Sequence, residues 1–131
     1  MGMTDPIANM LTLIRNAVKA KHEKVDIPNS KMVVAIADVM KNEGYIENYR
    51  IIKDTKQGIL RVYLRYLHKK PVILGLKRVS RPGLRIYADI RHVPQVLRGK
   101  GTVILTTSKG LLTDAQAKEQ KIGGEVLCYI W

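Results

Sequence analysis

The sequence predicts an α+β protein with two small domains, an αβαββ unit over residues 1–67 and a mostly β unit over residues 68–131 with one or two short helices. Two stretches of the first half repeat apolar residues at helical spacing, and each is followed by extended segments. The second half has short apolar runs separated by Pro and Gly. A chain of 131 residues is long enough for two small domains that share an interface.

The first predicted helix begins near residue 6. Thr4 or Asp5 can cap it, and Pro6 suits its first turn because that position needs no backbone donor. Apolar residues then recur every three or four positions, at Ile7, Met10, Leu11, Ile14 and Val18. This spacing predicts an amphipathic helix with one buried face.

A short strand over residues 24–28 separates this helix from a second one. Ser30 can cap the second helix and Gly44 can end it. Its predicted apolar face consists of Val33, Ile36, Val39 and Met40. The segments 45–53 and 59–67 then alternate well enough to form a hairpin closed by residues 54–58, which completes the αβαββ order.

Short strands and turns are predicted for the second half, within residues 71–80, 84–90, 92–101 and 102–107. Thr113 and Gln116 have the spacing of a capping box, which predicts a short helix over residues 114–122 that ends at Gly123 and Gly124. In the terminal strand the lone Cys128 alternates with Val126 and Ile130. We therefore expect Cys128 to be a buried small apolar residue.

The charge of the chain is its most unusual property. Its 23 Lys and Arg outnumber its 11 Asp and Glu, which gives a net charge of +12. Between residues 68 and 109 there are ten basic residues and one acidic residue, Asp89. They lie on predicted strands and turns, so they form a broad basic patch and not the one-sided helix that lipid surfaces favour. A patch of this kind favours a polyanion partner, with a solvated charged face as the alternative.

Enzyme motifs are weak by comparison. The segment RGKGT lacks the glycine, the Ser or Thr and the following helix of a phosphate loop. His22, His68 and His92 are scattered without metal-ligand spacing, and we expect all three at the surface. We predict no catalytic residues, no metal and no cofactor. A hydrolase that uses Cys128 stays as the enzyme alternative, to be tested by thiol alkylation.

No segment approaches the roughly 18 apolar residues that span a bilayer, and the amino terminus lacks the apolar region of a signal peptide. We therefore expect a soluble, cytoplasmic protein without a membrane partner.

The segment 106–110, TTSKG, favours RNA among the polyanions, and we call it the hydroxyl turn. Thr106, Thr107 and Ser108 can donate to and accept from a ribose or a base edge, while Lys109 neutralises a phosphate. No DNA-reading helix, finger or basic region is present in the sequence. Tyr87 offers a ring for base stacking, with burial in the core or a cross-strand contact as the alternative.

Three segments carry a resemblance to a known family. These are DPIANMLTLIRNA, RVSRPGLRIY and VILTTSKGLLTDAQAKEQKIGGEVLCYIW. Together they resemble the eighth protein family of the small ribosomal subunit, in its bacterial form, over essentially the whole chain. The resemblance implies a structural protein of the ribosome and not an enzyme.

The resemblance also implies where RNA binds. In that family the carboxy-terminal domain docks on the minor groove of an irregular helix in the central domain of small-subunit ribosomal RNA. Thr106 stands where the family more commonly has Ser. Glu125 is expected to accept hydrogen bonds from base amino groups or to orient the hydroxyls. The RNA-binding residues implied by the resemblance or by charge are Tyr87, Thr106, Thr107, Ser108, Lys109, Gly124, Glu125, Lys77, Arg81, Arg85 and, in the amino-terminal domain, Lys31.

Partners and roles follow from the same resemblance. It implies early binding during subunit assembly, neighbouring small-subunit proteins as partners, a free monomer, and repression of the protein's own operon through a messenger RNA site. A non-specific polyanion binder is the competing class, and competition with bulk transfer RNA separates the two.

Overall fold

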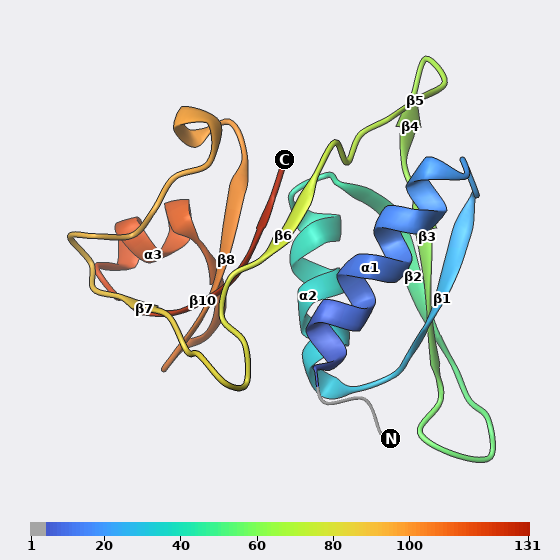
Figure 1. Ribbon diagram of the computed structural model, residues 1–131, viewed down its shortest axis with the longest axis horizontal. Helices are drawn as coiled ribbons and strands as arrows, with labels where there is room; N and C mark the ends of the chain where they lie inside the picture. The colour runs from blue at the N-terminus through green and yellow to red at the C-terminus, as the bar shows by residue number, and fades with distance from the viewer. Residues whose placement is uncertain (1–4) are drawn as a thin grey trace. The chain divides into compact units, whose positions relative to one another are not determined.

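The computed structural model describes residues 5–131, which divide into two compact units between Leu74 and Gly75. The first unit has the order helix, strand, helix, strand, strand, followed by a small hairpin, and the second is mostly β with one short helix. The predicted α+β class is confirmed. Figure 1 shows the elements of each unit.

Helix α1, Pro6–Lys19, begins as predicted. The Asp5 side chain accepts a hydrogen bond from the Ala8 N–H at 3.1 Å, and Pro6 occupies the first turn. Thr4, the alternative cap, lies outside the described residues. Ile7, Met10, Leu11 and Ile14 are buried as expected, but the fourth turn buries Ala17 and leaves Val18 half-buried. Ala17 and Val18 both lie next to the apolar face of the helix, and the smaller Ala17 faces the core.

Helix α2, Lys31–Asn42, is capped by Ser30, whose Oγ accepts from the Val33 N–H at 3.3 Å. It ends just before Gly44, which has a φ of +82°. The predicted apolar face is correct except at Val39, which is half-buried while Ala37 is buried.

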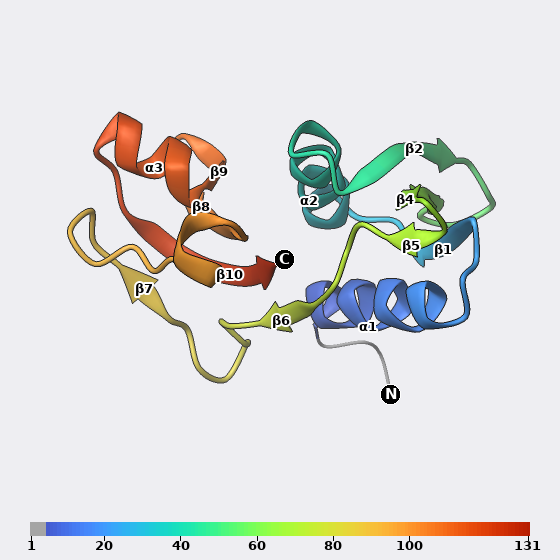
Figure 2. The same ribbon diagram turned by 90° about the horizontal axis from the view of Figure 1, so that it is seen from above.

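The helices of the first unit pack on an antiparallel sheet (Figure 2). Its strands are β1, Lys24–Pro28, β2, Ile46–Ile52, and β3, Ile59–Leu64, in the order β1-β3-β2. Strand β3 alternates, with Leu60, Val62 and Leu64 buried. The predicted β2–β3 hairpin is therefore confirmed, with β1 on the other side of β3.

A second hairpin was not predicted. It consists of β4, Tyr66–Leu67, and β5, Lys70–Pro71. The chain then returns to the first unit, because the Val72 N–H donates to the Arg65 carbonyl at 3.0 Å. As a result the two units divide at residue 74, a few residues beyond the boundary expected between residues 67 and 68.

The second unit is built around one antiparallel sheet. Its elements are β6, Leu76–Arg78, β7, Tyr87–Ala88, the 3₁₀ turn η1, Leu97–Gly99, β8, Thr102–Thr107, β9, Gly110–Thr113, α3, Asp114–Gln120, and β10, Gly124–Ile130. The sheet order is β6-β10-β8-β9, and β7 also pairs with β10. A core formed by Val103, Leu105, Leu112, Ala117 and Val126 lies between this sheet and α3.

Several strands predicted for this unit are shorter or missing. Only two residues of the segment 84–90 and four of the segment 71–80, Pro71 in β5 and the three residues of β6, are in strands. Residues 92–101 form a loop with η1. Pro94 cannot donate to a ladder, and Leu97 and Arg98 have φ of 50° and 55°, which no strand contains. Strand β9 was not predicted, because residues 110–113 were read as part of a turn and an apolar run.

The capping box of α3 is confirmed. The Gln116 N–H donates to Thr113 Oγ1 at 3.2 Å, and the Thr113 N–H donates to Gln116 Oε1 at 3.0 Å. The helix ends at Gln120, two residues earlier than predicted, because Lys121 turns into the left-handed region with a φ of 57°.

Strand β10 contains a β-bulge. Its register against β8 shifts by one residue between Val126 and Cys128, so that Leu127 is the extra residue. Leu127, Cys128 and Ile130 are all buried. The prediction that Cys128 is a buried apolar residue of this strand is confirmed, but the expected alternation with Val126 is wrong, because the bulge places Val126 on the opposite face of the sheet.

Candidate RNA interface

Four residues on four strands form a row across the second sheet. Tyr87 of β7 pairs with Glu125 of β10, Glu125 pairs with Thr106 of β8, and Thr106 pairs with Leu111 of β9. Directly paired residues of antiparallel strands share one face of the sheet. Leu105 and Val126, which alternate with Thr106 and Glu125, lie in the core beneath α3. The row therefore occupies the face opposite α3.

Glu125 is a buried carboxylate in the middle of this row. Its side chain is only 11% exposed, and Arg85 Nη1 lies 3.1 Å from its Oε2. The Arg85 side chain is 52% exposed, so the ion pair joins a buried acid to a base at the surface. An unpaired buried carboxylate would cost desolvation energy and would repel a phosphate. Arg85 thus makes Glu125 compatible with a polyanion.

Tyr87 does not belong to the core. Its side chain is 69% exposed although it lies in a strand beside Glu125. An aromatic ring held in this way presents a flat apolar face to the solvent. The structure therefore excludes burial of Tyr87 in the core but not a cross-strand contact, because Tyr87 pairs with Glu125. An exposed ring is available for stacking on a base or sugar.

The hydroxyl turn joins β8 to β9 next to this row. Thr107 Oγ1 donates to the Gly110 carbonyl at 2.8 Å and accepts from the Lys109 N–H at 3.0 Å. Gly110 has a φ of +94°, which a glycine adopts without strain. Thr107 therefore holds the turn in shape, while Ser108 and Lys109 are exposed. Within residues 5–131, no partner bonds the Ser108 hydroxyl.

Gly124 has a steric role in the same place. A Cβ at this position would lie 2.3 Å from the Thr106 carbonyl oxygen and 3.0 Å from Thr107 Cγ2. At the neighbouring Gly123 a Cβ would lie 2.3 Å from the Ala88 carbonyl oxygen. The two glycines allow the start of β10 to pack closely against β7 and β8. Gly124 thus supports the hydroxyl turn by its contact with Thr106 and Thr107.

The segment before Tyr87 is a tight loop pinned by a residue that the sequence analysis missed. Ser80 is fully buried, and its Oγ accepts from the Ile86 N–H at 2.8 Å and donates to the Ile86 carbonyl at 3.1 Å. At its tip Arg81 and Leu84 exchange backbone hydrogen bonds across Pro82 and Gly83. The signal for this loop was the small hydroxyl residue directly before RPG, a turn sequence.

The loop exposes both charge and apolar surface. Arg81 and Arg85 are exposed, and so is Leu84 at its tip, at 63%. Leu84 was also missed, because a single Leu between basic residues gives no signal in a sequence. Arg81 therefore lies at the tip of a fixed loop that leads into β7, which begins at Tyr87.

Two predicted residues are not brought to the row. Lys77 of β6 pairs with Tyr129, which pairs in turn with Val103 of the core, so the register places Lys77 on the α3 face. Lys31 is the first residue of α2 and belongs to the other unit. The row and its surroundings thus contain nine of the predicted residues, namely Tyr87, Thr106, Thr107, Ser108, Lys109, Gly124, Glu125, Arg81 and Arg85.

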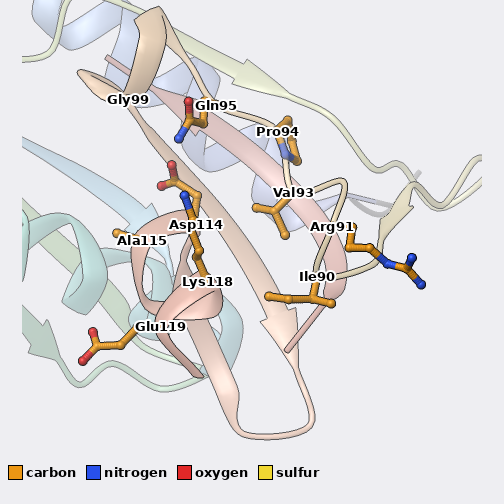
Figure 3. Close-up of a pocket in the computed structure, with 10 residues that line it drawn as sticks. All are labelled: Ile90, Arg91, Val93, Pro94, Gln95, Gly99, Asp114, Ala115, Lys118 and Glu119. Carbon is orange, nitrogen blue, oxygen red and sulfur yellow. The ribbon is translucent and has the colours of Figure 1, made fainter. Parts of the chain in front are cut away.

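A cavity of about 460 Å³ lies elsewhere on the second unit, between α3 and the loop that precedes β8 (Figure 3). Ile90, Val93 and Pro94 line it from the loop, and Ala115 and Lys118 from the helix. Asp114 also lines it, but its Oδ1 accepts from the Val103 N–H at 3.2 Å. None of the predicted RNA-binding residues lines this cavity.

The residues considered for catalysis or metal binding lie outside the row. Cys128 is fully buried, and burial raises the pKa of its thiol to about 12, so it is not a thiolate at neutral pH. His22, His68 and His92 are exposed as predicted. Among residues 5–131, no three His, Cys, Asp or Glu side chains gather in a way that could hold a metal ion. No helix in the same range has the length and apolarity to span a membrane.

Comparison with known proteins identifies the class. The model of a family described as ribosomal protein S8 matches residues 5–131. The chain is therefore a ribosomal protein, a structural protein and not an enzyme. It is 55% identical to the small ribosomal subunit protein uS8 of Geotalea uraniireducens, with both chains fully covered. It is 57% identical to the uS8 protein of Moorella thermoacetica, over 98% of this chain and all of that one. The chain belongs to the ribosomal protein S8 family.

Proposed function

We propose that the protein is a component of the small ribosomal subunit that binds central-domain ribosomal RNA directly through the sheet face opposite α3. The row of Tyr87, Glu125 and Thr106, continued by the exposed Ser108 and Lys109, carries this proposal. It combines a stacking surface, hydroxyl groups and a neutralised acid, which suits a minor-groove surface of RNA.

The charge distribution supports the same half of the chain. Residues 66–131 contain 12 basic and 4 acidic side chains. The carboxy-terminal unit is therefore proposed as the main RNA-binding half, with Lys31 as a peripheral contact and Lys77 as a phosphate contact outside the row. Early binding would help the central domain to fold and would bring the neighbouring subunit proteins together in the cytoplasm, starting from a free monomer.

A second role follows if the surface reads RNA shape. A messenger RNA that folds like the ribosomal site would bind to the same residues, because a shape-reading surface depends little on sequence. The protein would then repress translation of its own operon.

The test is binding to central-domain ribosomal RNA in competition with bulk transfer RNA. A specific complex resists a large excess of transfer RNA, and the operon messenger should displace the ribosomal RNA. If an equal mass of transfer RNA displaces ribosomal RNA from the wild-type protein, the protein is a non-specific polyanion binder. Footprinting on small-subunit RNA then locates the site.

A further inference from the structure

We propose that the tip of the β4–β5 hairpin, formed by His68, Lys69 and Lys70, is a second contact site for the phosphate backbone of RNA. This site lies on the first unit, on a hairpin that gave no signal in the sequence. The inference rests on the proposed function, because it takes RNA as the partner. It adds a contact that no residue of the row provides.

The base of the hairpin is fixed to both helices of its unit. The Tyr66 hydroxyl donates to the His22 carbonyl, just after α1, at 2.6 Å. Arg65 Nη1 donates to the Gly44 carbonyl, just after α2, at 2.8 Å. The Val72 N–H closes the hairpin on the Arg65 carbonyl. A tip on such a base has a defined position, although its strands contain only two residues each. Figure 1 shows the hairpin extending beyond the end of β3.

The backbone of the tip is strained. His68 and Lys69 form a two-residue loop between the paired Leu67 and Lys70, with φ of 52° and 66°. Positive φ at both positions is the pattern of a type I′ turn, for which Asn-Gly is the favoured sequence. His and Lys have a Cβ that disfavours this region. Strain of this kind is concentrated at functional sites, so the cationic residues indicate a use that outweighs it.

Two of the other non-glycine residues with positive φ have a local explanation that the tip lacks, whereas the two in η1 lie outside this explanation. Lys21 and Lys121 also have positive φ, but each follows a helix, where a left-handed residue ends the helix and a cation interacts favourably with its dipole. His68 and Lys69 follow no helix. The strain at the hairpin tip therefore needs a different reason.

The tip is exposed and positively charged. Residues 67–70 are all exposed, with Leu67 at 52%. Within residues 5–131, no acidic side chain pairs with Lys69 or Lys70. The turn held by Tyr66 carries Lys21, His22 and Lys24, with Glu23 as the one acid among them. Since Lys is a strongly hydrated point charge on a flexible stem, it suits phosphate contacts that do not read sequence.

The first experiment removes the charge. Lys69→Gln with Lys70→Gln is compared with Lys53→Gln with Lys56→Gln, which removes the same charge from the exposed β2–β3 loop of the same unit. Affinity of the full chain for central-domain ribosomal RNA is measured between about 0.05 and 0.3 M salt. Each lost phosphate contact reduces the log–log slope by about 0.7 to 0.9, and weakens binding about five- to eightfold at 0.1 M salt. We expect this loss for the tip variant only.

The second experiment relaxes the turn. His68→Asn with Lys69→Gly creates the favoured type I′ sequence, so it should raise the melting temperature by about 3 to 8 °C. The same variant should bind RNA about fivefold more weakly at 0.1 M salt, because one phosphate contact is lost. Stability and affinity thus change in opposite directions, which a purely structural hairpin would not show.

The outcomes are separable. If the wild-type protein prefers ribosomal RNA over transfer RNA but the tip and loop variants bind ribosomal RNA equally well, the inference alone is overturned. An acidic protein is then left as the occupant of the tip. A relaxed-turn variant that melts at or below the wild-type temperature overturns the strain argument, and the inference with it. Wild-type protein without any preference for ribosomal RNA overturns the proposed function, on which the inference rests.

Discussion

The two adjacent hydroxyls of the hydroxyl turn should respond differently to substitution. Thr107 Oγ1 makes two bonds within the turn, at 2.8 and 3.0 Å, whereas Ser108 makes none within residues 5–131. Thr107→Val keeps the shape and removes both bonds. At the low end for exposed groups, about 0.5 kcal/mol each, the loss is about 1 kcal/mol, or about 3 to 6 °C in melting temperature. Ser108→Ala removes no intramolecular bond and should leave melting within about 1 °C.

Binding should show the reverse order. If Ser108 donates to or accepts from a buried RNA partner, Ser108→Ala loses about 1 to 3 kcal/mol of binding, a factor of about 5 to 150 in dissociation constant. Thr107→Val should weaken binding less, because it alters the turn and not the contact itself.

Both variants are measured by thermal unfolding and by titration of central-domain ribosomal RNA at one salt concentration. Thr12→Val, on the exposed face of α1, is the control for the substitution itself. Unchanged affinity of Ser108→Ala would refute the assignment of Ser108 as a contact. Unchanged melting of Thr107→Val would refute the assignment of Thr107 as the residue that holds the turn.

Three further predictions follow from the second unit. For the wild-type protein we expect a log–log salt slope of RNA binding of about −3 to −6. Lys77→Ala should weaken the binding of ribosomal and transfer RNA alike, whereas Arg85→Ala should mainly weaken the binding of ribosomal RNA, because Glu125 loses its partner. Equal effects of the two variants would contradict the ion-pair argument. Gly124→Ala should lower the melting temperature by at least about 5 °C, because its Cβ meets a carbonyl at 2.3 Å, while Gly83→Ala, with no atom within 4 Å, should not. Cys128 should resist thiol reagents at pH 8 until the protein unfolds. Because the folded state raises its pKa from 9.0 to about 12, the thiol stabilises the fold below about pH 9 and less as the pH rises toward 12. Cys128→Ala should lack that alkaline loss, and rapid labelling of native protein would contradict the burial argument.

The sequence predicted those elements whose signals are local. Asp5, Ser30 and Thr113 each cap a helix within three residues, and Gly44 ends one. Such signals act between neighbours in the chain, so a single sequence contains them. The same holds for the alternation of β3 and for the burial of Cys128.

The missing elements depend on contacts distant in sequence. Strand β9 follows a turn and is a strand because it pairs with β8, and the short β4–β5 hairpin has no apolar alternation. The ion pair of Arg85 with Glu125 joins residues 40 positions apart. It could not be predicted from the sequence, because it depends on the register of β7 against β10.

The candidate site shows the same limit. Lys77 and Arg85 looked equivalent in the sequence, as basic residues on neighbouring strands. The pairing of β6 and β10 places Lys77 on the α3 face, and the ion pair places Arg85 beside the row. Which face a charge occupies is decided by sheet pairing, since a shift of one residue reverses it.

The bulge in β10 separates one strand into two reading frames. Before Leu127, the odd-numbered Glu125 shares its face with Thr106; after it, the even-numbered Cys128 and Ile130 lie on that face, opposite Ile104 and Thr102. The extra residue shifts the alternation of faces by one position, so the polar start of the strand and its apolar end each have an alternation of their own. The side chain of Glu125 can therefore be changed without altering the alternation that buries Cys128 and Ile130, whereas Gly124 is held by its close contact with Thr106 and Val126 by the core. An engineer who transplants this surface needs, from β10, the half-strand before the bulge, together with the residues of β7, β8 and β9 that pair across the row.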